Sequence, residues 1–176
     1  FDGDPALSIT PLAALRERAG PGTAVLYERA LATTRDRSTS GFRRAVALAE
    51  AADVTVVFVG EEAILSGEGH SRADIALPGA QLELVRQLKA TGKPVVAVIL
   101  AGRPLTLEDL ADAADAILFA WHPGAMGGPA IADLLFGQAS PSGRLPVSFP
   151  RMVGQLPLYY NQKNTGKPPS PASMVL

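Results

Sequence analysis

Val95-Val96-Ala97-Val98-Ile99-Leu100 is the stretch that decides the fold, because six apolar residues follow one another without interruption. A strand that is apolar on both faces is typical of a parallel sheet whose two faces are both covered by helices. Two further mainly apolar runs, at 53–59 and 116–120, are separated from this stretch by segments with helical spacing. Strands that alternate with helices in this way predict an α/β fold with a mainly parallel sheet.

Turn and cap signals divide the rest of the chain into further elements. Thr10 is expected to cap a first helix, with Pro11 at its first position and the glycines after it ending the helix. Short strands are expected at 24–27 and at 145–149, and Pro146 indicates that the second of these lies at a sheet edge. The spacing of apolar residues predicts helices over 10–19, 41–52, 78–91, 107–113 and 129–136.

The composition indicates a globular protein. Hydrophobic residues make up 47% of the chain and the net charge is only -1, which argues against a disordered or nucleic-acid-binding chain. Cysteine is absent, so disulfides and thiolate metal sites are excluded. No apolar run approaches the roughly 20 residues of a membrane span. We therefore expect neither a nucleic acid nor a membrane as a partner.

The length of 176 residues fits one domain with a core large enough to fold alone. We expect this domain to span residues 1–155. An extended tail or linker is expected over 156–176, where proline and polar residues accumulate. The chain opens with Phe1-Asp2-Gly3-Asp4, without a methionine or a basic and apolar leader, and we interpret it as an internal piece of a longer protein.

Glu68 is the candidate catalytic residue. It lies in the small, polar segment 60–72, which follows the strand at 53–59 and so emerges at the carboxyl end of the sheet, where α/β proteins place their chemistry. Glycines on both sides let the backbone approach a ligand closely. A carboxyl group there can donate a proton if its surroundings raise its pKa. From the residues alone, an exposed carboxylate without a function is an equal alternative.

Other polar residues of the same segment are expected to have different roles. Glu61 and Glu62 stand at the strand end, where we expect them to bond backbone amides or a nearby arginine rather than to catalyse. His70 is a candidate substrate-binding residue, with plain polar surface as the alternative. Arg72 and Asp74 are expected to brace the loop through charge-assisted hydrogen bonds.

The loop Trp121-His122-Pro123-Gly124-Ala125-Met126-Gly127-Gly128 is the second notable motif. It lacks the Gly-Lys-Ser/Thr ending of a phosphate-binding loop and the spacing of a dinucleotide fingerprint, so tight packing of a turn is the better interpretation. Trp121 is expected to belong to the core rather than to stack on a sugar. His122 has no partner at metal-ligand spacing, and we expect no metal and no cofactor. Ser66 is not part of a Gly-x-Ser-x-Gly elbow, so serine nucleophile chemistry is not supported.

Together these motifs resemble the second domain of family 3 glycoside hydrolases, especially the bacterial periplasmic β-glucosidase type. The similar segments follow one order through most of the chain: Ser66-Gly67-Glu68-Gly69, 71–81, 91–96, 101–105, 121–124, 127–137, 141–150, 153–160 and 164–166. The resemblance implies a six-stranded α/β sandwich with helices on both faces. It also implies a retaining enzyme that hydrolyses terminal β-D-glucosides or β-linked oligosaccharides, in the periplasm or outside the cell. A relative that acts on β-xylosides or short β-glucans is the alternative within the family.

The resemblance further implies the role of Glu68. In the β-glucosidases of this family the general acid/base is a glutamate at this position, and the nucleophile is an aspartate on a preceding barrel domain. Because retaining chemistry needs two carboxyl groups about 5–5.5 Å apart, the isolated chain is expected to be inactive. Some members that act on N-acetylglucosamine lack this glutamate, so the loop argues against that subgroup.

The alternative belongs to a different class of protein, a non-catalytic α/β module that binds a ligand or partner in a crevice at the sheet edge. The parent gene distinguishes the two, because only the enzyme requires a barrel domain before Phe1.

Overall fold

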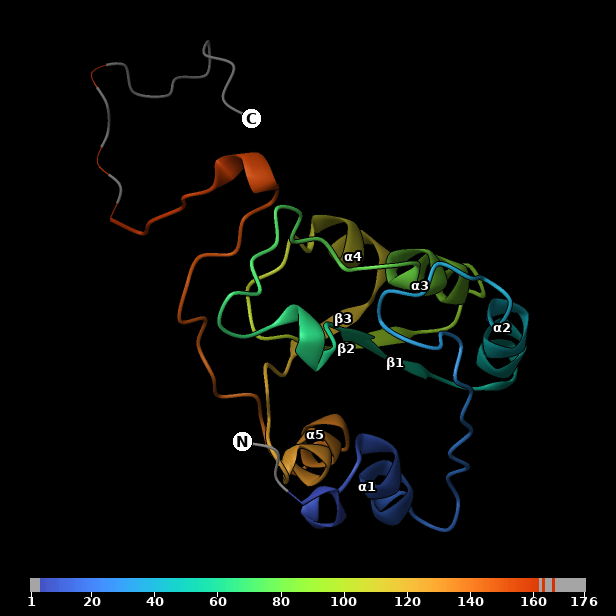
Figure 1. Ribbon diagram of the computed structural model, residues 1–176. Coiled ribbons are helices and arrows are strands. Elements are labelled where there is room, and N and C mark those ends of the chain that lie inside the picture. Colours follow the sequence, from blue (N-terminus) through green and yellow to red (C-terminus); the bar gives the residue numbers. More distant parts are fainter. Residues whose placement is uncertain (1–3, 162, 164–165, 167–176) are drawn as a thin grey trace.

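A computed structural model describes residues 4–161, 163 and 166 of the chain (Figure 1). Its helices and strands alternate as the sequence predicts. In chain order they are η1 (Pro5–Leu7), α1 (Pro11–Arg18), α2 (Phe42–Ala51), β1 (Thr55–Gly60), η2 (Ala63–Leu65), α3 (Gln81–Lys89), β2 (Val95–Leu100), α4 (Glu108–Ala113), β3 (Ala116–Phe119), α5 (Gly127–Leu135) and η3 (Val153–Gln155), where η marks a short 3₁₀ helix.

The three strands form one parallel sheet in the order β1-β2-β3. Val57 of β1 is in register with Ala97 of β2, and Val98 of β2 with Leu118 of β3. Strand β2 is central, and Val95, Ala97, Val98 and Ile99 have no exposed surface. This burial on both faces explains the uninterrupted apolar run, and the predicted α/β fold with a parallel sheet is confirmed.

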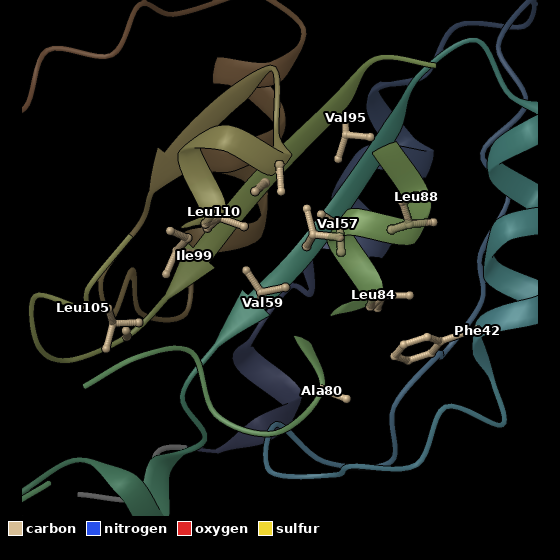
Figure 2. Close-up of a cluster of buried hydrophobic side chains, with 14 of the residues drawn as sticks. Phe42, Val57, Val59, Ala80, Leu84, Leu88, Val95, Ile99, Leu105 and Leu110 are labelled. Atoms are coloured by element: carbon tan, nitrogen blue, oxygen red, sulfur yellow. The ribbon is translucent and has the colours of Figure 1, made fainter. Parts of the chain in front are cut away.

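Helices cover both faces of the sheet. Figure 1 shows α2, α3 and α4 on one side and α1 with α5 on the other. On the first side, apolar side chains of β1, β2, α3 and α4 form the main core, and Figure 2 shows Val57, Val59 and Ile99 of the strands among Leu84, Leu88 and Leu110 of the helices. Burial of these side chains is the main stabilising contribution to the fold.

The pairing of α1 with α5 depends on a cap and a glycine. Thr10 caps α1 as predicted, because its hydroxyl accepts a hydrogen bond of 3.2 Å from the amide of Ala13. Gly128 in the first turn of α5 has no room for a side chain, since a Cβ atom there would overlap the carbonyl oxygen of Ile9. The two helices therefore pack closely against each other.

Two of the predicted strands are wrong. Neither 24–27 nor 145–149 forms a strand, so the described residues contain three strands instead of about six. An extended segment becomes a strand only when its backbone pairs with a neighbour. In both segments apolar side chains remain in solvent, with Leu26 52%, Tyr27 56% and Leu145 64% exposed.

The expected domain boundary near 155 stays a prediction. Of the expected tail at 156–176, residues 162, 164–165 and 167–176 lie outside the described residues. Over the residues that the structure does describe, no helix combines the length and apolar character needed to cross a membrane.

Candidate active site

The loops that follow the three strands leave the sheet at the same edge, because the strands are parallel (Figure 1). The loop after β1 carries Glu61, Glu62 and Glu68, the loop after β2 carries Arg103, and the loop after β3 carries His122. This carboxyl edge is the usual place for a site in an open α/β sheet. The structure therefore brings together polar residues that lie far apart in the sequence.

Gly60 closes β1 where the site begins. Its φ of 141° is unfavourable for residues with a side chain, and a Cβ atom there would overlap the carbonyl oxygen of Leu100. The next amide, that of Glu61, donates to this same oxygen at 2.8 Å. The glycine thus allows β1 and β2 to stay paired up to the first residue of the loop.

Glu61 is a buried carboxylate held between two arginines. Its side chain has no exposed surface, and it forms ion pairs with Arg72 and with Arg103, whose Nε atom lies 3.1 Å from Oε2. A buried charge is tolerated only when it is paired and hydrogen-bonded. The expectation that Glu61 bonds a nearby arginine is confirmed, although Arg103 is 42 residues away and was not recognised from the sequence.

The same two arginines hold the backbone of the loop. Arg103 Nη2 donates to the carbonyl oxygen of Leu65 and, at 2.8 Å, to that of His70. Arg72 Nη2 donates to the carbonyl oxygen of Ala76 at 3.0 Å. The predicted bracing role of Arg72 is confirmed, and its ionic partner is Glu61. Asp74 instead closes a local turn by accepting from the amide of Ala76 at 2.9 Å.

Glu62 is tied to the loop before α2. It forms an ion pair with Arg35, and its amide donates to the hydroxyl of Thr34 at 3.2 Å. The hydrogen bond from Arg35 lowers the pKa of the Glu62 carboxyl below its ordinary value. Glu62 is therefore an ionised, bonded side chain, as expected for a structural carboxylate.

Glu68 is exposed at the tip of the loop, in a turn between two glycines with positive φ, Gly67 at 121° and Gly69 at 76°. Among the described residues no hydrogen bond or ion pair to its carboxyl group is found. His70, also exposed, directs Nδ1 toward the carbonyl oxygen of Ser66 at 3.0 Å. This contact leaves Nε2 of His70 for another partner.

Ser66 and His122 meet at Gly102, a contact that the sequence did not indicate. A Cβ atom at Gly102 would overlap the hydroxyl of Ser66 and would lie 2.5 Å from Nε2 of His122. The only signal in the sequence is a glycine directly after the apolar run of β2. Its missing side chain lets the Glu68 loop and the loop after β3 approach the same point.

Trp121 packs into an aromatic cluster at the end of β3. Its ring lies edge-to-face with Phe119 at 4.5 Å and with Phe149 at 5.9 Å between ring centroids. The backbone of Trp121 has a φ of 53°, so the chain turns sharply there. The packing role expected for this residue agrees with these contacts.

In the described part of the chain, no group of three or more His, Cys, Asp or Glu side chains gathers in a way that could hold a metal ion.

The chain belongs to the glycosyl hydrolase family 3 C-terminal domain family, whose sequence model matches residues 2–173. It is 43% identical to a periplasmic β-glucosidase of Salmonella typhimurium, over 93% of this chain and 24% of that protein. It is 36% identical to a β-xylosidase of Formosa agariphila, over 93% of this chain and 22% of that protein.

Comparison with solved structures also finds similarity to a β-glucosidase. The β-glucosidase from Listeria innocua, in complex with gluconolactone, superposes with a TM-score of 0.85 at 37% identity, over 96% of this chain and 23% of that chain. The present chain thus spans about a quarter of the length of the proteins it matches.

Proposed function

We propose that this chain is the acid/base-bearing domain of a retaining β-glucosidase, and that Glu68 is its general acid/base. The observation that carries the proposal is the placement of Glu68: an exposed carboxyl group at the tip of an anchored loop, on the carboxyl edge of the sheet. Membership of the family and the relatives named β-glucosidase support it. The domain itself is proposed to span residues 1–155.

The reaction proceeds in two steps. A nucleophilic carboxylate attacks the anomeric carbon while Glu68 transfers its proton to the leaving oxygen, so the glycosidic bond breaks and a covalent glycosyl-enzyme forms. Glu68, now ionised, then takes a proton from water, whose oxygen attacks the same carbon and releases the sugar. Both groups are carboxylates, and the chemistry needs no cofactor.

The electrostatics of the three glutamates favour Glu68 for this role. A general acid must be protonated when the substrate binds, and positive neighbours keep a carboxyl group ionised. Glu61 lies between two guanidinium groups, and the pKa of Glu62 is lowered by Arg35. Among the described residues Glu68 is not paired in this way, so its exposed carboxyl group remains available to a substrate.

The remaining components of the site are proposed to come from outside this chain. A barrel domain of the same enzyme supplies the nucleophile, which agrees with relatives about four times as long as this chain. The substrate is a β-linked glucoside or oligosaccharide, and His70 contacts its sugar near the leaving group. A periplasmic or secreted location is proposed from the relative that is named periplasmic.

The test is Glu68→Gln in the parent enzyme, with two substrates of different leaving group. For cellobiose, whose leaving oxygen needs a proton, kcat/KM is expected to fall about 10²–10⁴-fold. For a dinitrophenyl glucoside, whose leaving group needs almost none, kcat/KM is expected to stay nearly unchanged. The control is Glu17→Gln, an exposed glutamate of α1, which is expected to alter neither value. Equal losses with both substrates would contradict the proposal and indicate a structural role for Glu68.

A further inference from the structure

We propose that Arg103 is a positioning residue for Glu68: its guanidinium group sets the place of the turn that carries the acid/base. The inference rests on the proposed function of Glu68. It concerns a residue on a different loop, which reaches the turn that carries Glu68 through the backbone carbonyl oxygens of Leu65 and His70.

The contacts of Arg103 join both ends of the turn to one buried charge. Nη2 donates to the carbonyl oxygens of Leu65 and His70, which lie on opposite sides of Glu68 in the chain. Nε donates to Glu61, whose side chain has no exposed surface. Because one planar group makes all three contacts, a shift of the guanidinium would move both ends of the turn together.

Glu61 and Arg103, which form the ion pair, are both held close to the ends of strands. Glu61 directly follows β1 and its amide is bonded to Leu100 at the end of β2, while Arg103 follows β2 after two residues. Leu105, just beyond Arg103, has no exposed surface. Both partners are therefore fixed to neighbouring strand ends, and a catalytic group is held most accurately when its support belongs to such elements.

Within the tip of the loop, His70 contacts the carbonyl oxygen of Ser66 through Nδ1 and donates its amide to that of Gly67 at 3.1 Å, but these bonds do not tie the tip to the sheet. Ile64 is 61% exposed, and Gly67 and Gly69 add conformational freedom on both sides of Glu68. Arg72 shares the Glu61 carboxylate but holds Ala76, which lies beyond the turn. Arg103 is thus the arginine whose loss should affect the position of Glu68, whereas loss of Arg72 should mainly affect stability.

The experiment is Arg103→Met in the parent enzyme, assayed with cellobiose and with the dinitrophenyl glucoside. Since a misplacement of about 1 Å can cost on the order of 10²-fold, kcat/KM for cellobiose is expected to fall about 10–10²-fold. For the dinitrophenyl glucoside the expected loss is below about threefold, because that substrate hardly uses the acid. A general loss of folded enzyme would lower both values by the same factor.

Three further variants complete the design. Arg86→Met removes an exposed arginine that pairs with Asp109 away from the loop, and is expected to leave both rates unchanged. Arg72→Met breaks the ion pair between Arg72 and the same buried carboxylate, that of Glu61. It is expected to lower the melting temperature, and to change the ratio of the two rates less than Arg103→Met does. Adding Arg103→Met to Glu68→Gln should lower the cellobiose rate by less than about threefold more, because residues that act as a unit are not additive.

Two results would overturn the inference: equal losses with both substrates in Arg103→Met, or a full multiplicative loss in the double variant. If the methionine variant does not fold, Arg103→Lys decides, since lysine keeps the charge but not the planar fork. A wild-type ratio of the two rates in Arg103→Lys would then overturn it. Failure of the proposed function is distinct, because in that case Glu68→Gln itself would not discriminate between the substrates.

Discussion

The side-chain amide of Gln81 binds both backbone groups of Gly60. Its Oε1 accepts from the amide of Gly60 at 2.7 Å, and its Nε2 donates to the carbonyl oxygen of Gly60 at 2.8 Å. The same Nε2 also donates to the carbonyl oxygens of Thr34 and Pro78, each at 3.0 Å. Gln81 is only 2% exposed, so one buried side chain joins the end of β1, the loop before α2 and the turn before α3, directly beside Glu61.

Replacing Gln81 with Met is therefore expected to destabilise the chain by about 2–4 kcal/mol, because the buried backbone groups of Gly60 lose their partners. The measurement is the free energy of unfolding in urea. The matched control is Gln87→Met on the same helix, since the one side-chain hydrogen bond of Gln87 among the described residues goes to the exposed side chain of Glu83 at 3.3 Å. Similar losses for both variants would show that the network around Gly60 does not stabilise the fold.

Gly102→Ala is expected to reduce the activity of the parent enzyme through the Glu68 loop. The new methyl group would displace the hydroxyl of Ser66 or the ring of His122, and Ser66 is only two residues from Glu68. We expect kcat/KM for cellobiose to fall about 10-fold or more, as small displacements of catalytic groups do. Gly20→Ala is the control, because no heavy atom of the described residues, apart from Gly20 itself and its two chain neighbours, lies within 4 Å of the position of its Cβ. Unchanged activity in Gly102→Ala would mean that the loop tolerates this displacement.

The hydrogen bonds of Asp115 predict how the free energy of unfolding changes at acidic pH. The hydrogen bond from Lys89 and the 2.8 Å bond from the amide of Val95 hold the pKa of the Asp115 carboxyl below its ordinary value of 3.8. A carboxyl group with a lowered pKa in the folded state stabilises the fold above its unfolded pKa, and this contribution is lost as the pH falls through the folded pKa.

Asp115→Asn should accordingly be less stable than the wild type at pH 7, and the difference should shrink as the pH falls below about 4. Urea midpoints measured at pH 7 and at pH 3 test this expectation. Asp112→Asn, which removes an exposed carboxylate of α4, controls for the change in net charge. A difference between Asp115→Asn and the wild type that stays constant over this range would contradict it.

Much of the fold could be predicted from local patterns. The strand β2 has the predicted bounds, and α1 begins with Thr10 as its cap and Pro11 at its first position, as expected. Both features depend on residues that are adjacent in the sequence, namely an uninterrupted apolar run and a capping residue followed by proline. The failed strands at 24–27 and 145–149 show the limit of such patterns. Apolar residues in an extended segment do not specify whether a neighbouring strand is available for pairing.

The site could be predicted only in part for the same reason. Glu61 and Glu62 are expected to bond backbone amides or a nearby arginine, and Arg72 is such a partner of Glu61, 11 positions away. The further partners Arg103 of Glu61 and Arg35 of Glu62 lie 42 and 27 positions away. Only the fold brings strand ends of different elements to one edge. The role of Gln81 was also missed, because a polar residue at the start of an amphipathic helix is normally expected to face solvent.

The isolated chain of 176 residues is expected to hydrolyse no aryl β-glucoside at a measurable rate. It lacks the second carboxyl group, and holding both groups in register supplies much of the rate enhancement. The measurement is release of the aryl group by the purified chain. Turnover close to that of a complete β-glucosidase would contradict the proposal that another domain supplies the nucleophile.

Azide tests most directly whether Glu68 is the acid/base. In the parent enzyme with Glu68→Ala and a dinitrophenyl glucoside, the glycosyl-enzyme should form readily and then accumulate, because no base activates water. Azide needs no deprotonation, so it should speed turnover in this variant and yield the β-glucosyl azide, which retains the configuration of the substrate. The account predicts this product and an initial burst of dinitrophenolate. A variant that shows neither a burst nor any azide adduct would contradict it.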